Sequence, residues 1–221
     1  MTNVFKTFTE KLKKIDSDMK NKAVVAIKIG TKRKLTPGEI AMSRLVFKDS
    51  IDYAKVWIHL GGLVHTKTGN AMTPAGEIYI SAKDYEQNPD FSVSRPNLKH
   101  WFIHEMTHVW QYQMGVSTGW LGIKQLCNGG YTSTVNSADS GDELKAYDTD
   151  LMGRDINKKF QDFNFEQQGR IIEFYFDGTF LKNEEPHRKH LKISKSLQGK
   201  VLNILKDFLI NPKNKLMLPK G

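Results

Sequence analysis

Apolar residues recur at helical spacing in three segments of the chain. Residues 97–114 contain no proline or glycine and stop at Gly115, and their apolar stripe is Phe102, Met106, Val109 and Trp110. Apolar residues three or four positions apart indicate an α-helix with one buried face. The same spacing predicts a helix at about 4–19 and another at about 196–210, the latter with the stripe Leu197, Val201, Ile204, Leu205 and Phe208.

Capping residues predict three further helices. Thr36-Pro-Gly-Glu39 combines a capping box with proline at the first helical position, so a helix should run from there to about Phe47. Ser140 is followed three residues later by Glu143, the same pattern, and predicts a helix at about 141–151. Asn164 is a candidate N-cap for a helix at about 165–182.

Strands are predicted at 55–60 and 77–81, where β-branched and aromatic residues are frequent, and residues 23–29 form a short β-like run. The glycine-rich residues 115–141 are expected to form a loop over the cleft. These elements predict an α+β fold, mostly helical, with a small sheet next to the helix at 97–114. An edge strand of that sheet is expected to bind an extended substrate through main-chain hydrogen bonds.

Composition limits the class of protein. No run of 18 apolar residues is present, so no membrane span is expected, and the first residues lack the apolar core of a secretory signal peptide. We therefore expect synthesis in the cytoplasm without a signal peptide. The single cysteine, Cys127, excludes an internal disulfide.

Charge is distributed unevenly and suggests three parts. The net charge is +9, and residues 1–34 and 182–221 each carry ten basic residues against three acidic ones, so the acidic excess lies in the middle. We expect a basic N-terminal helical segment at 1–34, a catalytic core at 35–181 and a basic C-terminal helical segment at 182–221. The basic ends fit either solvated helix faces or docking on an anionic surface. No nucleic-acid-binding motif is present, and no nucleic-acid partner is expected.

The segment His104-Glu-Met-Thr-His108 carries the candidate chemistry. Histidines at i and i+4 project from one face of a helix and can hold one metal ion. Zinc accepts imidazole nitrogens and keeps one position for water in catalytic sites. Glu105 is rotated by about 100° from His104, so it can reach that water without being a ligand. We therefore expect Zn²⁺ at His104 and His108, with Glu105 as the general base. His100 lies one turn earlier, and it cannot share the ion because His100 and His108 are about 12 Å apart along the axis.

A catalytic zinc usually needs a third protein ligand. The residues after His108 lack the further histidine of the metzincin class, which leaves a downstream glutamate. Glu143 and Glu166 are both candidates. A local role is available to each, since Glu143 fits a capping box and Glu166 fits the first turn of a helix, where an acid complements the helix dipole.

Several stretches resemble, in order, a family of zinc metallopeptidases encoded beside bacterial type VI secretion and rearrangement-hotspot genes, the valine-glycine-repeat-related proteins. They are Leu35-Thr-Pro-Gly-Glu-Ile-Ala, Ile51-Asp-Tyr-Ala-Lys-Val, Ala71-Met-Thr-Pro-Ala-Gly-Glu-Ile-Tyr-Ile, Phe102-Ile-His-Glu-Met-Thr-His-Val-Trp-Gln and Phe165-Glu-Gln-Gln. The resemblance implies a zincin-like fold with the gluzincin ligand set His104, His108 and Glu166. Gly169 and Arg170 depart from the pattern, which expects alanine at the first position and, in many gluzincins, aspartate at the second. No partner for a zinc histidine can therefore be assigned.

The expected reaction is amide hydrolysis by a zinc metallopeptidase, with Tyr147 as a candidate oxyanion donor whose alternative role is helix packing. The resemblance implies an antibacterial effector delivered by a secretion-apparatus carrier into the periplasm or cytoplasm of a target cell, and it is compatible with an immunity protein. A protein or the peptide of peptidoglycan could be the substrate. A third interpretation is a non-catalytic delivery module with a structural metal, but such a site needs no general base and would close zinc with a fourth protein ligand.

Overall fold

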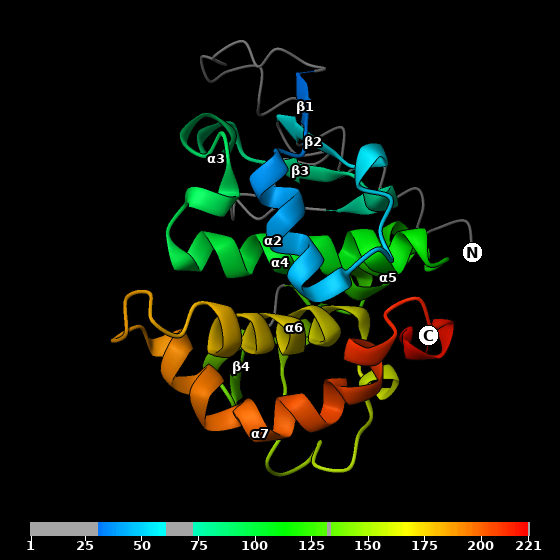
Figure 1. Cartoon of the computed structure of the whole chain (residues 1–221). Coiled ribbons are helices and arrows are strands. Elements are labelled where there is room, and N and C mark those ends of the chain that lie inside the picture. The colour runs from blue at the N-terminus through cyan, green and yellow to red at the C-terminus, as the bar shows by residue number, and fades with distance from the viewer. Residues whose placement is uncertain (1–30, 61–72, 132–133, 221) are drawn as a thin grey trace, which may run out of the picture.

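The computed structural model describes residues 31–60, 73–131 and 134–220 (Figure 1). Within them the helices are α2 (Pro37–Phe47), α3 (Ala82–Gln87), α4 (Pro96–Gln113), α5 (Thr118–Cys127), α6 (Phe165–Phe180) and α7 (Lys189–Ile210). The strands are β1 (Lys32–Lys34), β2 (Trp57–Leu60), β3 (Ile78–Ile80), β4 (Thr134–Ser137) and β5 (Gly141–Leu144). The expected mostly helical α+β class is confirmed. The helix expected at 4–19 and the β-like run at 23–29 lie outside the described residues.

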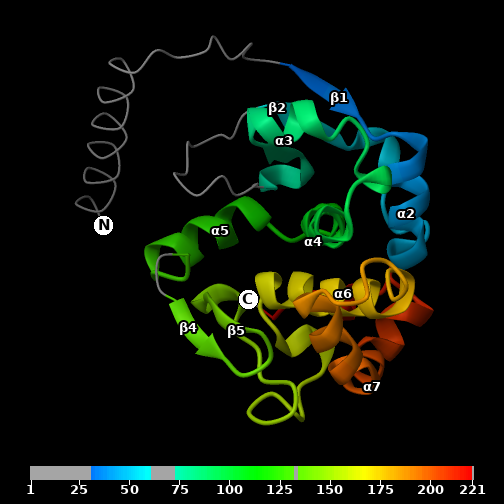
Figure 2. The same cartoon turned by 90° about the vertical axis from the view of Figure 1, so that its left-hand side faces the viewer.

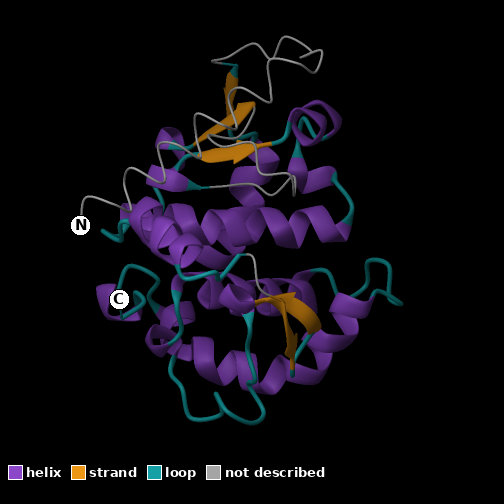
Figure 3. Cartoon of the chain, turned by 180° about the vertical axis from the view of Figure 1, so that it is seen from behind, coloured by secondary structure: helices purple, strands orange, loops and turns teal. Residues whose placement is uncertain are grey.

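The described elements form layers on either side of α4. Strands β1, β2 and β3 form one sheet in that order, antiparallel between β1 and β2 and parallel between β2 and β3. Figure 2 views α4 along its axis, with this sheet and α3 on one side and α6 followed by α7 on the other. The second sheet is the hairpin of β4 and β5, whose strands are orange in Figure 3. The helix that carries both histidines is therefore the central layer.

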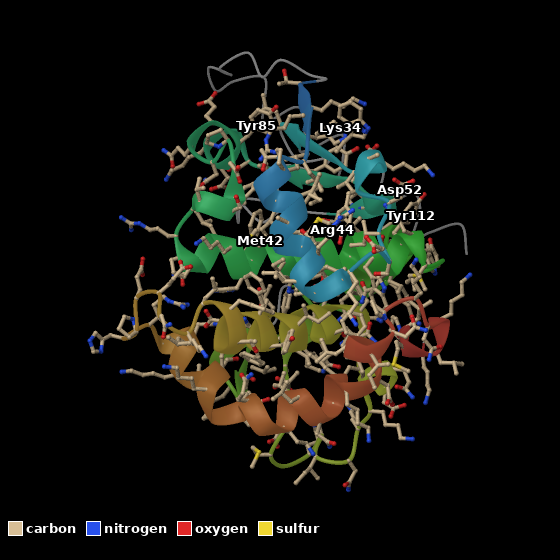
Figure 4. The ribbon with its side chains drawn as sticks, viewed as in Figure 1. Lys34, Met42, Arg44, Asp52, Tyr85 and Tyr112 are labelled. Atoms are coloured by element: carbon tan, nitrogen blue, oxygen red, sulfur yellow. The ribbon has the colours of Figure 1, made fainter. Side chains whose placement is uncertain are left out.

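One apolar core joins these layers. Side chains fill the space between them, where Met42 belongs to the inner face of α2 (Figure 4). The expected α4 stripe is fully buried, and all five residues of the expected α7 stripe are also in the core. Ile58, Ile78 and Ile80 bury one face of the first sheet. Among the described residues, no helix is long and apolar enough to cross a membrane.

The segment after α4 differs from the prediction. Residues 115–141 were expected to form a loop, but they contain α5 and β4. Gly119 and Gly122 lower helix propensity by about 1 kcal/mol each relative to alanine. The helix forms nevertheless, and its start is fixed to the core because the Thr118 hydroxyl donates to the carbonyl oxygen of Thr73 at 3.2 Å.

The helix predicted at 141–151 is wrong. Residues 141–144 are strand β5, in which Glu143 pairs with Val135. The turn before it uses Gly141 at a φ of 87°, which favours glycine. Ser140 lies near the Ser137 hydroxyl instead of capping a helix. A four-residue capping pattern without an apolar stripe was therefore insufficient to predict a helix.

The two capping patterns allow a matched stability test. Thr36 Oγ1 accepts a hydrogen bond of 3.0 Å from the Glu39 backbone N–H, and Glu39 Oε2 accepts one from the Thr36 N–H. Thr36→Ala should therefore lower the free energy of unfolding by about 1 kcal/mol in urea denaturation. Ser140→Ala, which removes a hydroxyl that caps no helix, should change it by less than about 0.5 kcal/mol. Equal losses in the two variants would contradict this assignment of the caps.

Candidate metal centre

Helices α4 and α6 bring three candidate ligands together. His104 and His108 lie one turn apart on α4, and Glu166 lies in the first turn of α6. The expected cap of α6 is confirmed, since Asn164 Oδ1 accepts a hydrogen bond from the Gln167 backbone N–H and Gln167 Oε1 accepts one from the Asn164 backbone N–H. Because α6 packs against α4, this cap fixes the position of Glu166 opposite the histidines.

The three ligand atoms form a nearly equilateral triangle. Glu166 Oε2 is 3.0 Å from His104 Nε2 and 3.0 Å from His108 Nε2, and the two nitrogens are 3.1 Å apart. All three side chains are buried. The corners of such a triangle lie about 1.8 Å from its centre, so a point about 2 Å from each atom, the usual zinc–ligand distance, exists just outside its plane. The donor set of two imidazoles and one carboxylate also fits zinc.

The hydrogen bonds of Gln111 determine the tautomer of His108. Gln111 Nε2 donates to the Phe165 carbonyl oxygen at 3.0 Å and to Gln168 Oε1 at 2.9 Å. The amide oxygen of Gln111 must therefore face His108 Nδ1, 2.9 Å away, and it can only accept. In the neutral imidazole the proton is consequently on Nδ1, and the lone pair of Nε2 points at the triangle.

Glu173 lies beside Nδ1 of His104, as Gln111 lies beside Nδ1 of His108. Its Oε1 is 3.6 Å from His104 Nδ1, and its Oε2 accepts a hydrogen bond of 2.8 Å from Arg170. Glu173 lies seven residues after Glu166, two helical turns along the same face of α6. Carboxylates commonly orient metal-binding histidines in this way. The sequence interpretation missed Glu173 and Gln111, although spacings of seven and three residues from the candidate ligands could have indicated both.

The imidazoles and carboxylates of the centre stabilise each other's charged forms. Burial acts to lower the pKa of His104, but the carboxylates of Glu173 and Glu166 outweigh burial and raise that pKa to about 10. Burial likewise opposes a charged His108, and Glu166 raises its pKa. Burial acts to raise the pKa of Glu166, but His108 and His104 hold it below its usual range. The buried carboxylates thus stabilise positive charge at the triangle.

Glu105 lies between the two histidines in sequence and outside the triangle. It is buried, and its Oε2 accepts a hydrogen bond of 2.6 Å from Thr73 Oγ1. Thr73 directly precedes the 3-10 turn Pro74–Gly76, which packs on α4. Within the described part of the chain, Oε1 of Glu105 makes no hydrogen bond. One carboxylate oxygen is therefore fixed, while the other has no hydrogen-bond partner among residues 31–60, 73–131 and 134–220.

Two tyrosines contact the centre. Tyr147 lies in the 3-10 turn Lys145–Tyr147, not in a helix, and its ring centroid is 5.6 Å from that of His104. Burial, followed by the charge of Glu166, raises the pKa of Tyr147 well above its usual value, so the phenol stays protonated. The hydroxyl of Tyr131 donates to Glu166 Oε1. Tyr131 falls in the segment predicted to be a loop, and no sequence pattern indicated it.

Glu143, the other candidate for the third ligand, lies on β5, whereas the triangle is completed by Glu166 of α6.

The group of His100, Glu173 and His190 is the second set of ligand-type side chains that lies close together in the described residues. The rings of His100 and His190 are stacked, with their centroids 4.0 Å apart and an angle of 5° between their planes. Their in-plane lone pairs therefore cannot converge on one point. His190 Nδ1 instead lies 2.8 Å from Oδ2 of Asp177, and the other oxygen of Asp177, Oδ1, lies 2.7 Å from the Arg188 guanidinium. We interpret this group as an ionic network behind His104.

Gly169 provides a steric test of the centre. A Cβ at this position would lie 2.6 Å from Cε1 of His104, a separation that forces the imidazole to move. Gly169→Ala should therefore weaken zinc binding at least about tenfold in a titration with a competing chelator. Gly199→Ala on α7 is the matched control, because no described heavy atom lies within 4 Å of its Cβ. The control should keep its zinc affinity, and an unchanged affinity in Gly169→Ala would argue against a role for His104.

Comparisons with known proteins give two matches. No protein-family model matches the chain. The chain is 34% identical over 145 residues to the type VI secretion system spike protein VgrG2b of Pseudomonas aeruginosa. That match covers 65% of this chain and 13% of VgrG2b, so the chain corresponds to a small part of the relative. The solved effector domain of Pseudomonas aeruginosa VgrG2b is similar in fold, with a TM-score of 0.51, 25% identity, and coverage of 87% of this chain and 95% of that domain.

Proposed function

We propose that the protein is a zinc-dependent metallopeptidase that hydrolyses amide bonds. The observation that carries this proposal is the triangle of Nε2 of His104, Nε2 of His108 and Oε2 of Glu166, with sides of 3.0, 3.0 and 3.1 Å. In neutral histidines with protonated Nδ1, all three atoms present lone pairs to one another. Three buried acceptors of this kind need a proton or a cation between them, and the raised pKa of both histidines reflects that need; a divalent cation at their centre would take the place of the protons.

Zinc bound by these three residues would lower the pKa of a coordinated water and polarise a substrate carbonyl. Glu105 acts as the general base, since its Oε1 is available to take the proton of the attacking water and return it to the leaving amine. Thr73 holds Oε2 and thereby limits rotation of the carboxylate. Gln111 accepts the Nδ1 proton of His108, and the Glu173 carboxylate lies 3.6 Å from Nδ1 of His104, so both groups favour the orientation of the rings.

Tyr147 is proposed as the donor to the oxyanion. A neutral phenol can donate a hydrogen bond to negative charge that develops on the substrate oxygen. Its ring lies against His104, and its hydroxyl makes no hydrogen bond to Glu166 in the described structure. These features suit a donor whose hydrogen is not taken by Glu166.

We further propose that the chain acts as an effector of a type VI secretion system. The similarity to VgrG2b supports this proposal, because that relative is a spike protein of such a system and the similar fold is its effector domain. The coverage of 95% of the effector domain, against 13% of the whole spike protein, favours the effector domain over the spike as the equivalent of this chain.

Zymography tests the reaction class. Zinc-loaded protein should clear a gel containing casein, and 1,10-phenanthroline should prevent clearing until zinc is restored. A parallel gel containing cell-wall sacculi tests hydrolysis of peptidoglycan peptides. Clearing of the sacculi alone would replace the protein substrate with peptidoglycan, and clearing of neither gel by zinc-loaded protein would contradict the proposal.

A further inference from the structure

The two oxygens of the Glu166 carboxylate have separate partners. Oε2 is the oxygen that faces His104 and His108, at 3.0 Å from each Nε2. Oε1 accepts a hydrogen bond from the hydroxyl of Tyr131. The Glu166 side chain is buried, with 6% of its surface exposed. The phenol is therefore the group that determines what the second oxygen can do.

The binding mode of a carboxylate affects how many positions remain around a metal ion. Carboxylates bind metals through one oxygen or through both. A catalytic zinc has three protein ligands and an open position for water or substrate. A second oxygen from Glu166 would compete for that position. A hydrogen bond donated to Oε1 by an O–H group occupies a lone pair of this oxygen and holds the oxygen away from the metal.

We infer that Tyr131 is a positioning residue that keeps Glu166 bound to the metal through Oε2 alone, so that the fourth coordination position stays open. This inference rests on the proposed metal centre and adds to it the control of coordination number. Tyr131 is itself held in place by a row of packed rings. Its ring centroid lies 6.2 Å from that of Tyr147, and the ring centroid of Tyr147 lies 5.6 Å from that of His104. Tyrosine is suited to this position, since it provides a donor and a ring that packs.

Cobalt(II) provides a spectroscopic test, because its visible absorption is strong in four-coordinate sites and weaker in sites with more ligands. Wild type, Tyr131→Phe and Tyr112→Phe are each loaded with one equivalent of cobalt(II). Tyr131→Phe removes only the O–H group, and its visible bands should lose intensity as Oε1 joins the metal. Tyr112→Phe makes the same change at an exposed tyrosine near the end of α4, and its bands should match those of the wild type.

The outcomes separate this inference from the proposed function. A wild-type protein that takes up neither cobalt nor zinc would contradict the metal centre itself. Normal uptake with identical spectra for wild type and Tyr131→Phe would overturn the role of Tyr131 alone. If Tyr131→Phe does not fold, X-ray absorption of the zinc-loaded wild type makes the same test: four nearest nitrogen or oxygen neighbours support the inference, and five or more overturn it.

Discussion

Glu105→Gln should abolish hydrolysis of casein and leave zinc at about one equivalent per chain. Glutamine has the same shape, and its amide oxygen can still accept the hydrogen bond from Thr73 that Glu105 receives at 2.6 Å. Glutamine cannot accept a proton from water, and general-base catalysis typically contributes about 10²–10⁴-fold to the rate. We therefore expect hydrolysis to fall by at least that factor, measured with a fluorescent casein substrate alongside elemental analysis of the purified protein.

Glu86→Gln is the matched control for this experiment. It makes the same chemical change on an exposed residue of α3, so both activity and zinc content should equal those of the wild type. Full activity in zinc-loaded Glu105→Gln would refute the proposed mechanism. Loss of zinc in that variant would instead assign Glu105 to the ligands, which the triangle does not include.

Glu166→Ala should eliminate stable zinc binding. It removes the one ligand that α6 contributes and leaves two histidines, too few for a catalytic zinc site. Zinc that binds only the folded state stabilises it by about 4 kcal/mol when its concentration is a thousand times the Kd. The wild-type melting temperature should therefore rise on addition of zinc and fall with a chelator, and in Glu166→Ala it should do neither.

Glu143→Ala separates the two glutamates considered as the third ligand. Because Glu143 lies on β5 and Glu166 completes the triangle, this variant should keep the full zinc-dependent rise in melting temperature. The readout is the effect of zinc and not the absolute stability, since removal of the buried Glu166 carboxylate also changes the stability of the metal-free protein. A zinc response in Glu166→Ala together with none in Glu143→Ala would reverse the assignment.

The parts of the structure that sequence predicted correctly depend on local patterns. The apolar stripe of α4, the Thr36 cap of α2 and the Asn164 cap of α6 each involve residues within one or a few turns, and each element formed where expected. Helical spacing alone also explains why His104 and His108 face the same point. Glu166 meets the two histidines only because α6 packs on α4, and no regular spacing of residues along the sequence indicates this packing.

The errors and omissions depend on contacts between distant residues. The hairpin of β4 and β5 pairs Val135 with Glu143, and this pairing overrides the local capping pattern at Ser140. Thr73 reaches Glu105 across 32 residues and Tyr131 reaches Glu166 across 35. Such partners are set by tertiary packing, so neither hydroxyl could be found from composition or periodicity.

The distribution of the ligands along the chain has a consequence for biosynthesis. His108 and Glu166 are 58 residues apart, and Glu166 belongs to a helix made well after α4. A growing polypeptide folds progressively from its N-terminus as it leaves the ribosome. Any nascent or truncated product that ends before α6 would carry Glu105 and both imidazoles yet lack the third ligand of the proposed metal centre, so the proposed hydrolytic activity would arise only after translation had passed this helix.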